Sequence, residues 1–239
     1  MRGAALLLVA LTLTGCETSA EKSAKLEREA RRQAAVAQRS QTGLSVTRQS
    51  TSVKVVDATV VRSSEGAAAA VTVRNVSART LRAVPIAITV KDARGQTLFQ
   101  NDAAGLEAGL TSIGSLPAHG EATWVDDQIP QSGEPTSVSA RVGEAPPRTG
   151  PTPQIEIEGL RPSEEPTGGA AGTVRNRSRI AQRKLVVYVL ARRAGRIVAA
   201  GRAVLPEVAP GTSAPFQVFL VGAAAGAKLQ ASAPPTTFD

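Results

Sequence analysis

The sequence contains one cysteine and one histidine, and aromatic residues make up only 3% of its 239 positions. A single cysteine cannot form a disulfide within the chain, so the fold must be stabilised by burial and strand pairing. With one cysteine and one histidine, a zinc site of the usual ligand set cannot be assembled. The sequence also lacks a Gly-x-Ser-x-Gly elbow and a phosphate-binding Gly-Lys-Ser/Thr loop. It therefore predicts a protein that is not an enzyme, with no catalytic residue, no metal and no cofactor.

Long apolar runs are absent as well. Only the segment from Ala4 to Leu13, which follows Arg2, is strongly apolar, and it is too short to span a bilayer. A basic start, a short apolar stretch and small residues at its end are typical of an export signal, here residues 1–15.

The end of this signal, Leu13-Thr14-Gly15-Cys16, resembles the lipobox of bacterial lipoproteins. The resemblance implies that a diacylglycerol is attached to Cys16 and that the chain is cut just before it. The protein would then be held by this lipid at the outer face of the bacterial cytoplasmic membrane, because two acyl chains anchor a protein stably whereas one chain binds a membrane only marginally. The alternative is an ordinary secreted protein in which Cys16 is lost with the signal or remains a free thiol.

Basic residues outnumber acidic ones by 28 to 20, which gives a net charge of +8 at pH 7. Arginine supplies 22 of the 28, and beside abundant alanine and glycine this bias is typical of a GC-rich genome. The charge is uneven, with a net of −2 over residues 53–145 and +5 over residues 151–239. Because net charge alone does not identify a partner, we do not predict nucleic-acid binding.

Residues 16–50 are expected to form the lipidated N-terminus and a polar spacer. The segment is rich in helix formers, but Leu26 and Val36 are the only large apolar side chains between residues 17 and 40. A helix here would have no apolar face to bury. We therefore expect a solvated spacer that is helical or disordered.

From residue 53 onward the chain repeats itself with an offset of 101 positions. Thr72-Val73-Arg74-Asn75-Val76-Ser77 is matched by Thr173-Val174-Arg175-Asn176-Arg177-Ser178. A strand-like run precedes each motif, and apolar runs and glycine turns follow each motif at matching places, which indicates an internal duplication. The repeats span residues 53–145 and 154–235, and a proline-rich linker at 146–153 joins them.

Each repeat contains short runs rich in valine, isoleucine and threonine, broken by Gly, Pro, Asn and Ser. Such runs are typical of antiparallel strands. About seven runs in roughly 90 residues favour a sandwich of two sheets. We therefore expect an all-β protein with two tandem immunoglobulin-like antiparallel β-sandwich domains, held at a fairly fixed separation by the prolines of the linker.

One strand and turn in each repeat resemble the FxLYD-type immunoglobulin-like domains of bacterial envelope proteins. That family has bulky apolar residues two apart, then a polar residue and an aspartate that opens a turn to glycine. The residues that fit are Ile88, Val90, Asp92 and Gly95 in the first repeat and Tyr188, Leu190 and Gly195 in the second. Arg192 departs from the pattern by replacing the aspartate. The resemblance covers roughly residues 53–145 and 151–235 and implies accessory modules; it adds little about activity.

Three polar positions are expected to serve turns. His119 lies in a glycine turn, and we align Pro210 with it in the second repeat. A position that proline can fill is a turn position, so we favour this reading over a catalytic or metal-binding histidine. Asn75 and Asn176 begin glycosylation sequons, but Asn and Ser after a strand more simply serve a turn.

Two adjacent acidic residues, Asp126 and Asp127, could hold a Ca²⁺ with Asp102 and Glu121 at one end of a sheet. Successive strand residues point to opposite faces, so both aspartates cannot face one ion unless the strand bends. We therefore favour a solvated strand end over a metal site.

Basic residues of the second repeat provide a candidate anion-binding group. Its members are Arg175, Arg177, Arg179, Arg183 and Lys184. Arg192, Arg193 and Arg196 at the next turn need not join them, because one strand between would separate the two groups by about 25 Å. Two interpretations stay open: arginines spread over a solvated surface, or weak attraction to anionic lipid or envelope polymers that salt would screen.

The first repeat is nine residues longer than the second between glycines that we align, Gly95 to Gly120 against Gly195 to Gly211. The extra segment, about residues 102–114, carries Leu106, Leu110 and Ile113 at helical spacing. Long loops on a rigid sheet often bind, so these three residues mark a possible partner loop. The alternative is a short helix that caps an open edge of the sandwich.

Together these features predict a non-catalytic, membrane-anchored envelope lipoprotein that acts as a binding or scaffolding module for another envelope protein. The alternative is adhesion of the basic second domain to anionic lipid or a cell-envelope polymer. The salt dependence of binding separates the two.

Overall fold

The computed structural model describes residues 43–130, 133–163 and 168–238. These residues form an all-β structure without a helix, which confirms the prediction of an all-β fold. The export signal, Cys16 and most of the predicted spacer lie outside the described residues. The strands of the first repeat are β1 (Val53–Arg62), β2 (Ala67–Asn75), β3 (Leu81–Lys91), β4 (Thr97–Gln100), β5 (Ser112–Leu116), β6 (Glu121–Ile129) and β7 (Ser137–Val142). Those of the second are β8 (Ile155–Pro162), β9 (Gly169–Asn176), β10 (Gln182–Arg193), β11 (Arg196–Val208), β12 (Ser213–Phe219), β13 (Val221–Gly222) and β14 (Lys228–Ser232).

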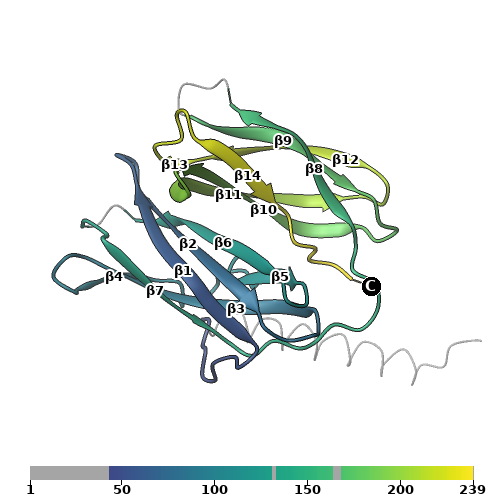
Figure 1. The fold of residues 1–239 in the computed structure, drawn as a ribbon, viewed down its shortest axis with the longest axis horizontal. Helices are drawn as coiled ribbons and strands as arrows, with labels where there is room; N and C mark the ends of the chain where they lie inside the picture. Colours follow the sequence, from purple (N-terminus) through teal and green to yellow (C-terminus); the bar gives the residue numbers. More distant parts are fainter. Residues whose placement is uncertain (1–42, 131–132, 164–167, 239) are drawn as a thin grey trace, which may run out of the picture. The chain divides into compact units, whose positions relative to one another are not determined.

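The two repeats share an order of strands, except that β13 of the second repeat has no counterpart in the first (Figure 1). In the first repeat, β1-β2-β6 form one sheet, and β3 of the other sheet pairs with β4, β5 and β7. In the second, β8-β9-β12 form one sheet and β14-β10-β11-β13 the other. Neighbouring strands are antiparallel throughout. Each repeat therefore has a β-sandwich architecture, and the duplication seen in the sequence is present in the fold.

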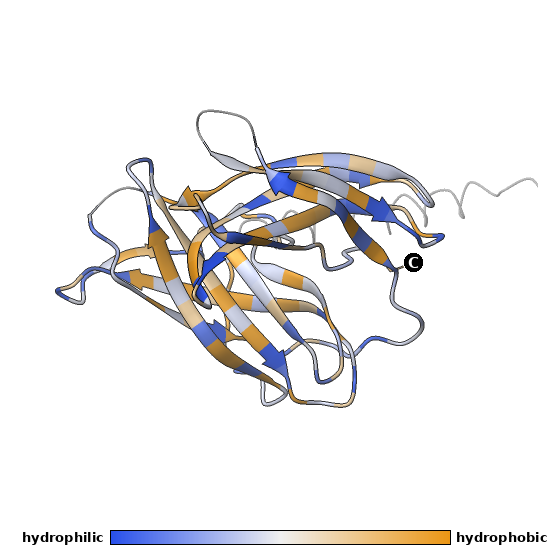
Figure 2. Cartoon of the chain, turned by 45° about the horizontal axis from the view of Figure 1, so that its top comes forward, coloured by the Kyte–Doolittle hydropathy of each residue, from blue (hydrophilic) through white to orange (hydrophobic). Residues whose placement is uncertain are grey.

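The core of the first sandwich follows from alternating burial along its strands, whereas β10 of the second is a continuous apolar run buried from Leu185 to Ala191 (Figure 2). In β3, Val84, Ile86, Ile88 and Val90 are buried, whereas the residues between them are half-buried or exposed. Trp124 in β6 is fully buried in the same core. Two sheets of branched aliphatic residues thus supply the burial that the scarcity of aromatic rings and disulfides requires.

Residues 42 to 239 form one compact unit. The predicted boundary of the spacer, residues 16–50, therefore lies too far along the chain, because residues of its C-terminal end belong to the folded unit. Val46 is buried, and a side chain on Gly43 would collide with the backbone oxygen of Asp102. The backbone N–H of Ser50 donates a hydrogen bond to Val142, 2.8 Å away. These contacts make the last residues before β1 part of the folded unit.

The first residues of the proline-rich linker are also bonded to the first repeat. Pro147 forms a bridge with Leu81, and the Arg148 N–H donates to the carbonyl of Thr80 at 2.7 Å. The linker therefore continues the edge of the sheet beyond β7 before it crosses to β8.

A buried asparagine closes the same turn in both repeats. Asn75 is inaccessible to solvent; its Nδ2 donates to three carbonyls, and its Oδ1 accepts from the N–H and hydroxyl of Ser77 at 3.0 and 2.8 Å. Asn176 and Ser178 repeat this arrangement, with distances of 3.0 and 2.7 Å. The prediction that these motifs serve turns is confirmed, because buried amides engaged in this way are not exposed modification sites.

The repeats align differently at the histidine than the sequence suggested. The Asn75 N–H donates to the carbonyl of Gly120, and the Asn176 N–H donates to that of Thr212. Gly120 therefore corresponds to Thr212, and His119 to Gly211 rather than to Pro210. Both residues have positive φ angles, 54° and 69°. His119 is a turn residue, as predicted, but the reason is a left-handed conformation that proline could not adopt.

We expect His119→Gly to raise the free energy of unfolding by about 0.5–1 kcal/mol. A non-glycine residue in the left-handed region destabilises the folded state by about 1–2 kcal/mol, and glycine removes this strain. Glycine also gives the unfolded chain more conformational freedom, which offsets about half of that gain. Urea denaturation of the wild type and the variant measures the difference. His119→Ala, which keeps the strain, is the control and should not be stabilised.

The longer segment of the first repeat is a loop between β4 and β5. Asn75 to Gly120 spans 45 positions and Asn176 to Thr212 spans 36, so the first repeat is nine residues longer between these equivalent positions, as predicted. In the second repeat, one continuous strand, β11, takes the place of both β4 and β5. The loop is not helical, so the alternative of a capping helix is wrong. The helical spacing of Leu106, Leu110 and Ile113 predicted a helix wrongly, because Ile113 belongs to strand β5 and not to the loop.

Candidate functional site: the junction of the two repeats

The two repeats meet through sheet faces that an isolated sandwich would expose to solvent. β11 and β13 contact β1 and β2, and β10 and β11 contact β6. Ala68 and Ala70 of β2 are fully buried and lie on the strand face opposite to the inner residues Val71 and Val73. Small side chains let two sheet backbones approach closely. As a result, residues of the second repeat join the core of the first; they are Val186, Tyr188, Leu190, Ile197, Ala200 and Val221.

A buried charge cluster, here called the junction clasp, ties the repeats together. It consists of Arg202 from β11 and the adjacent residues Asp126 and Asp127 from β6. Arg202 Nη2 lies 2.9 Å from Asp126 Oδ1, and Nε lies 3.2 Å from Asp127 Oδ1. The Arg202 side chain is 5% exposed, and those of the two aspartates are 6% and 16% exposed.

Arg202 also binds the backbone of the first repeat. Its Nη1 donates to the carbonyls of Leu110 and Val125 at 3.0 and 3.1 Å, and its own N–H donates to Asp127 Oδ2 at 2.9 Å. Leu110 accepts a second hydrogen bond, from the indole Nε1 of Trp124 at 3.1 Å. The guanidinium thus joins the insertion loop, β6 and β11 at one point.

A β-bulge in β6 lets both aspartates reach one cation. Ala69 pairs with Asp126 but Ala67 pairs with Ile129, so β6 carries one extra residue between these pairs. The bulge bends the strand at the place where strict alternation would turn the two carboxylates apart. The prediction of a solvated strand end is wrong, because Asp126 is buried and its carboxylate forms an ion pair with the Arg202 guanidinium. Asp102 and Glu121, which we grouped with this pair, lie elsewhere; Glu121 pairs with Arg74.

Burial shapes the electrostatics of the clasp. It raises the pKa of the Asp126 carboxyl above its ordinary value, while the charge of Arg202 opposes the shift. Burial also raises the pKa of the Tyr188 phenol, whose hydroxyl lies 3.4 Å from the carbonyl of Ser112 in the first repeat. Tyr188 is therefore a neutral part of the junction.

The three residues of the predicted partner loop have different environments. Ile113 is fully buried in the core and cannot contact a partner. Leu110 is half-buried against that core, and Leu106 is 37% exposed. Beside Leu106, Glu107 forms an ion pair of 2.8 Å with Lys184 of the second repeat. The loop thus spans the junction; residues 102–108 are exposed, and Leu106 is the one predicted partner-loop residue among them.

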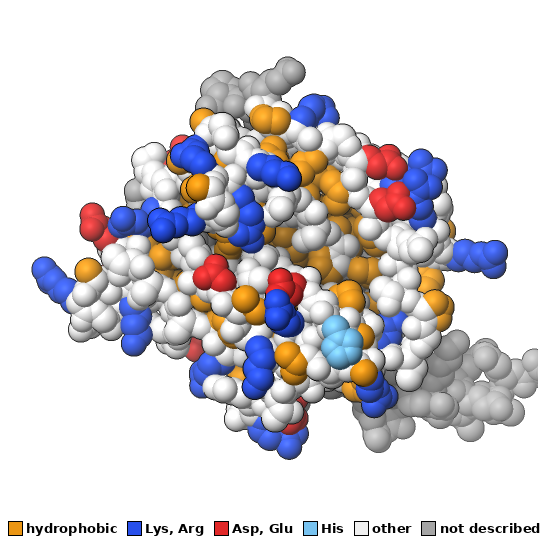
Figure 3. Space-filling view, in the orientation of Figure 1, with side chains coloured by type: hydrophobic (Ala, Val, Ile, Leu, Met, Phe, Trp, Pro, Cys, Tyr) orange, Lys and Arg blue, Asp and Glu red, His pale blue; other side chains and the backbone are white. Residues whose placement is uncertain are grey.

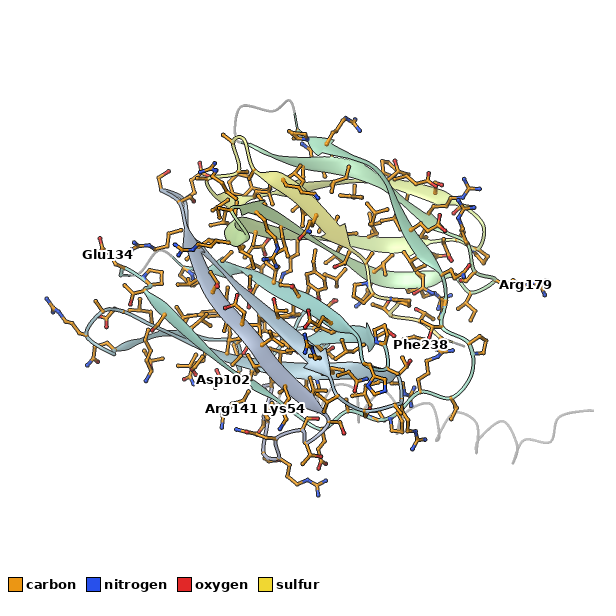
Figure 4. The ribbon with its side chains drawn as sticks, viewed as in Figure 1. Lys54, Asp102, Glu134, Arg141, Arg179 and Phe238 are labelled. Atoms are coloured by element: carbon orange, nitrogen blue, oxygen red, sulfur yellow. The ribbon has the colours of Figure 1, made fainter. Side chains whose placement is uncertain are left out.

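The C-terminal segment crosses the same junction. Fully buried Gln182 accepts hydrogen bonds from the Thr236 and Thr237 N–H groups at 3.0 and 3.2 Å. A side chain on Gly114 of β5 would lie 2.4 Å from the carbonyl oxygen of Pro235, so only glycine allows this approach. Phe238 then lies against the guanidinium of Arg148 in the linker, 4.3 Å from ring centroid to Cζ (labelled in Figure 4).

The candidate basic group is largely neutralised by neighbouring acids. Arg175 lies 3.9 Å from Glu158, Arg177 pairs with Glu156 and lies 3.6 Å from Glu158, and Lys184 pairs with Glu107. Arg179 and Arg183 are exposed and have no acidic partner among the described residues. Arg179 projects from the turn between β9 and β10 (Figure 4). Basic side chains are scattered over the face seen in Figure 3 and do not gather in one field.

Arg192, Arg193 and Arg196 lie at the other end of the same strand, β10, or just after it, as the sequence predicted. Arg192 donates to Gln230 at 2.9 Å and to the carbonyl of Gly195 at 3.0 Å, and Arg193 bonds the loop at Ala225. The first two therefore hold turns in place. In the first repeat, Asp92 does the same work by accepting from two backbone N–H groups of its turn, at 2.9 and 2.8 Å.

In the part of the chain that the structure describes, no group of three or more His, Cys, Asp or Glu residues could hold a metal ion. The same residues include no helix long and apolar enough to cross a membrane. No protein-family model matches the sequence, and the search of curated proteins gives no match. The junction is therefore interpreted from its own chemistry.

Proposed function

We propose that the protein is a non-catalytic envelope lipoprotein, anchored through Cys16, that acts as a binding or scaffolding module for another envelope protein. The export signal and its Leu13-Thr14-Gly15-Cys16 end support the anchor. In this proposal the two repeats are FxLYD-type immunoglobulin-like domains, a class of accessory modules. The same β-sandwich architecture in both repeats supports that assignment.

The observation that carries the proposal is the junction clasp. Two domains on a flexible linker would each bind independently, whereas repeats that share a core and a buried ion pair present their surfaces in one fixed geometry. A rigid double sandwich on a lipid anchor suits the positioning of a partner at the membrane. Fixed geometry also lowers the entropy cost of binding.

The test is co-sedimentation of residues 42 to 239, the compact unit, with membranes and cell walls of the source organism at low and high salt. Binding that survives high salt, followed by cross-linking to one protein, supports the scaffold. No binding at either salt concentration contradicts it.

The second candidate is adhesion to anionic lipid or an envelope polymer, for which the exposed arginines Arg179 and Arg183 are the favourable observation. Binding that is lost in high salt and abolished by the triple change Arg177→Ser, Arg179→Ser and Arg183→Ser would support adhesion. The matched control replaces three arginines that are also exposed: Arg94 and Arg141 in the first repeat and Arg48 just before it. An equal loss of binding in both triple variants would indicate non-specific attraction and contradict the adhesion hypothesis.

A further inference from the structure

A small pocket, here called the junction pocket, lies beside the clasp. Its volume is about 110 Å³. The apolar side chains of Phe99, Leu106 and Leu110 line it together with Ala103. Ligand sites for drug-sized molecules usually exceed roughly 300 Å³, so this pocket has room for a single side chain or a short alkyl group.

The polar part of the pocket is built from buried charge. Asp126, Gln128 and Arg202 line it, and the Asp126 side chain is 6% exposed. Asp126 Oδ1 accepts from Arg202 Nη2 at 2.9 Å and from the Gln128 N–H at 3.2 Å. None of the described residues donates a hydrogen bond to Asp126 Oδ2. Asp126 Oδ2 is not one of the fully buried polar atoms without a partner, so a carboxylate oxygen of a residue that lines the pocket can still accept a hydrogen bond.

The charges of the clasp do not balance. With both aspartates ionised, two carboxylates face one guanidinium, and no other Lys or Arg of the described residues pairs with them. The cluster then carries a net charge of −1 in a largely desolvated place. A cation that enters the pocket restores neutrality, an anion worsens the imbalance, and a neutral apolar group leaves it uncorrected.

We propose that the junction pocket binds a primary alkylammonium group, and that its occupant is a lysine side chain of the partner protein. The aliphatic stem would lie against Phe99, Leu106 and Leu110, and the ammonium would donate to Asp126 Oδ2. Lysine fits better than arginine because its charge is compact and its stem is narrow, whereas guanidinium is planar and broad. The identity of the occupant rests on the proposed function; the chemistry of the pocket does not.

The experiment titrates residues 42 to 239 with 1-aminobutane at constant ionic strength and follows backbone amides by ¹⁵N–¹H NMR. We expect saturable shifts centred on Ala103, Asp126 and Gln128. The probes 1-butanol and butyrate have the same stem without the positive charge. They should bind at least roughly tenfold more weakly, because a hydrogen bond to a charged group is lost.

Two variants test the pocket from different sides. Ala103→Leu fills it from the exposed loop without touching the clasp, and Asp126→Asn removes the negative charge. Both should abolish saturable binding of 1-aminobutane. Asp102→Asn, an exposed carboxylate next to Ala103 that does not line the pocket, is the matched control and should bind like the wild type. Equal binding of 1-butanol, or undiminished amine binding in both pocket variants, overturns the proposal.

The same variants separate this inference from the proposed function. If the envelope partner binds wild type and Ala103→Leu equally and 1-aminobutane causes no shifts, the pocket proposal fails and the scaffold stands. If 1-aminobutane binds as expected but no envelope protein does, the pocket stands as an amine site and the scaffold fails. A partner that is lost only with Ala103→Leu and Asp126→Asn supports both.

Discussion

Replacement of Arg202 by alanine is expected to lower the free energy of unfolding by about 3–5 kcal/mol, the cost of removing one partner from a buried ion pair. Arg202→Ala leaves Asp126 and Asp127 without a counter-charge and removes the Arg202 donor from the carbonyl of Val125 and one of the two donors from that of Leu110. Urea denaturation measures the loss as a midpoint shift of about 1–2 M.

The matched control is Arg196→Ala, in the same strand. Arg196 is exposed and has no ion pair among the described residues, so its loss should change stability by less than about 0.5 kcal/mol. Arg202→Met should cost less than Arg202→Ala, because it fills the space, yet still leaves two buried acids. A change below about 1 kcal/mol for Arg202→Ala would show that water reaches the aspartates and that the clasp does not hold the repeats together.

The sequence predicted the sandwiches because their signals are local. The alternation in β3, the Asn75 and Asn176 motifs and the glycine turns each report on residues close in the chain, and the duplication makes the asparagine motif and the glycine turns appear twice. The error at His119 was also local. An alignment by residue type placed proline at a position that backbone hydrogen bonds assign to Gly211.

The junction could not be predicted in the same way, because it depends on contacts between residues about 75 positions apart. Asp126 and Asp127 seemed incompatible with one cation until the bulge in β6 was known. One signal was present: Ala67 to Ala70 are apolar at every position, which is typical of a strand buried on both faces. Arg202, a charge within the apolar strand β11, was the other. The two signals together indicate a buried face with a required partner, but neither identifies the partner.

We expect Asn176→Ala and Asn75→Ala each to lower the free energy of unfolding by about 3 kcal/mol. In the second repeat, Asn176 Nδ2 donates to the carbonyls of Ile180, Val208 and Ala209 at 2.8, 3.0 and 3.3 Å. Alanine removes one donor from each of these carbonyls and the acceptor of the Ser178 N–H. The carbonyls of Ile180 and Ala209 keep other donors, so the cost falls mainly on the Val208 carbonyl and the Ser178 N–H, at about 1–3 kcal/mol for each unsatisfied group. Urea denaturation of both variants measures the loss, and similar values are expected because the first repeat has the same bonds.

Two further changes identify which half of the amide matters. Ser178→Ala removes only the hydroxyl that bonds Asn176 Oδ1 and should cost about 1 kcal/mol. Asn176→Asp keeps the acceptor for Ser178 but replaces the donor with an oxygen that faces three carbonyls, so it should cost at least as much as Asn176→Ala. If Asn176→Asp were as stable as the wild type, the donor bonds would not hold the turn. The strand ends β9 and β11 would then be joined by packing alone, and the recurrence of this asparagine 101 positions apart would have no structural reason.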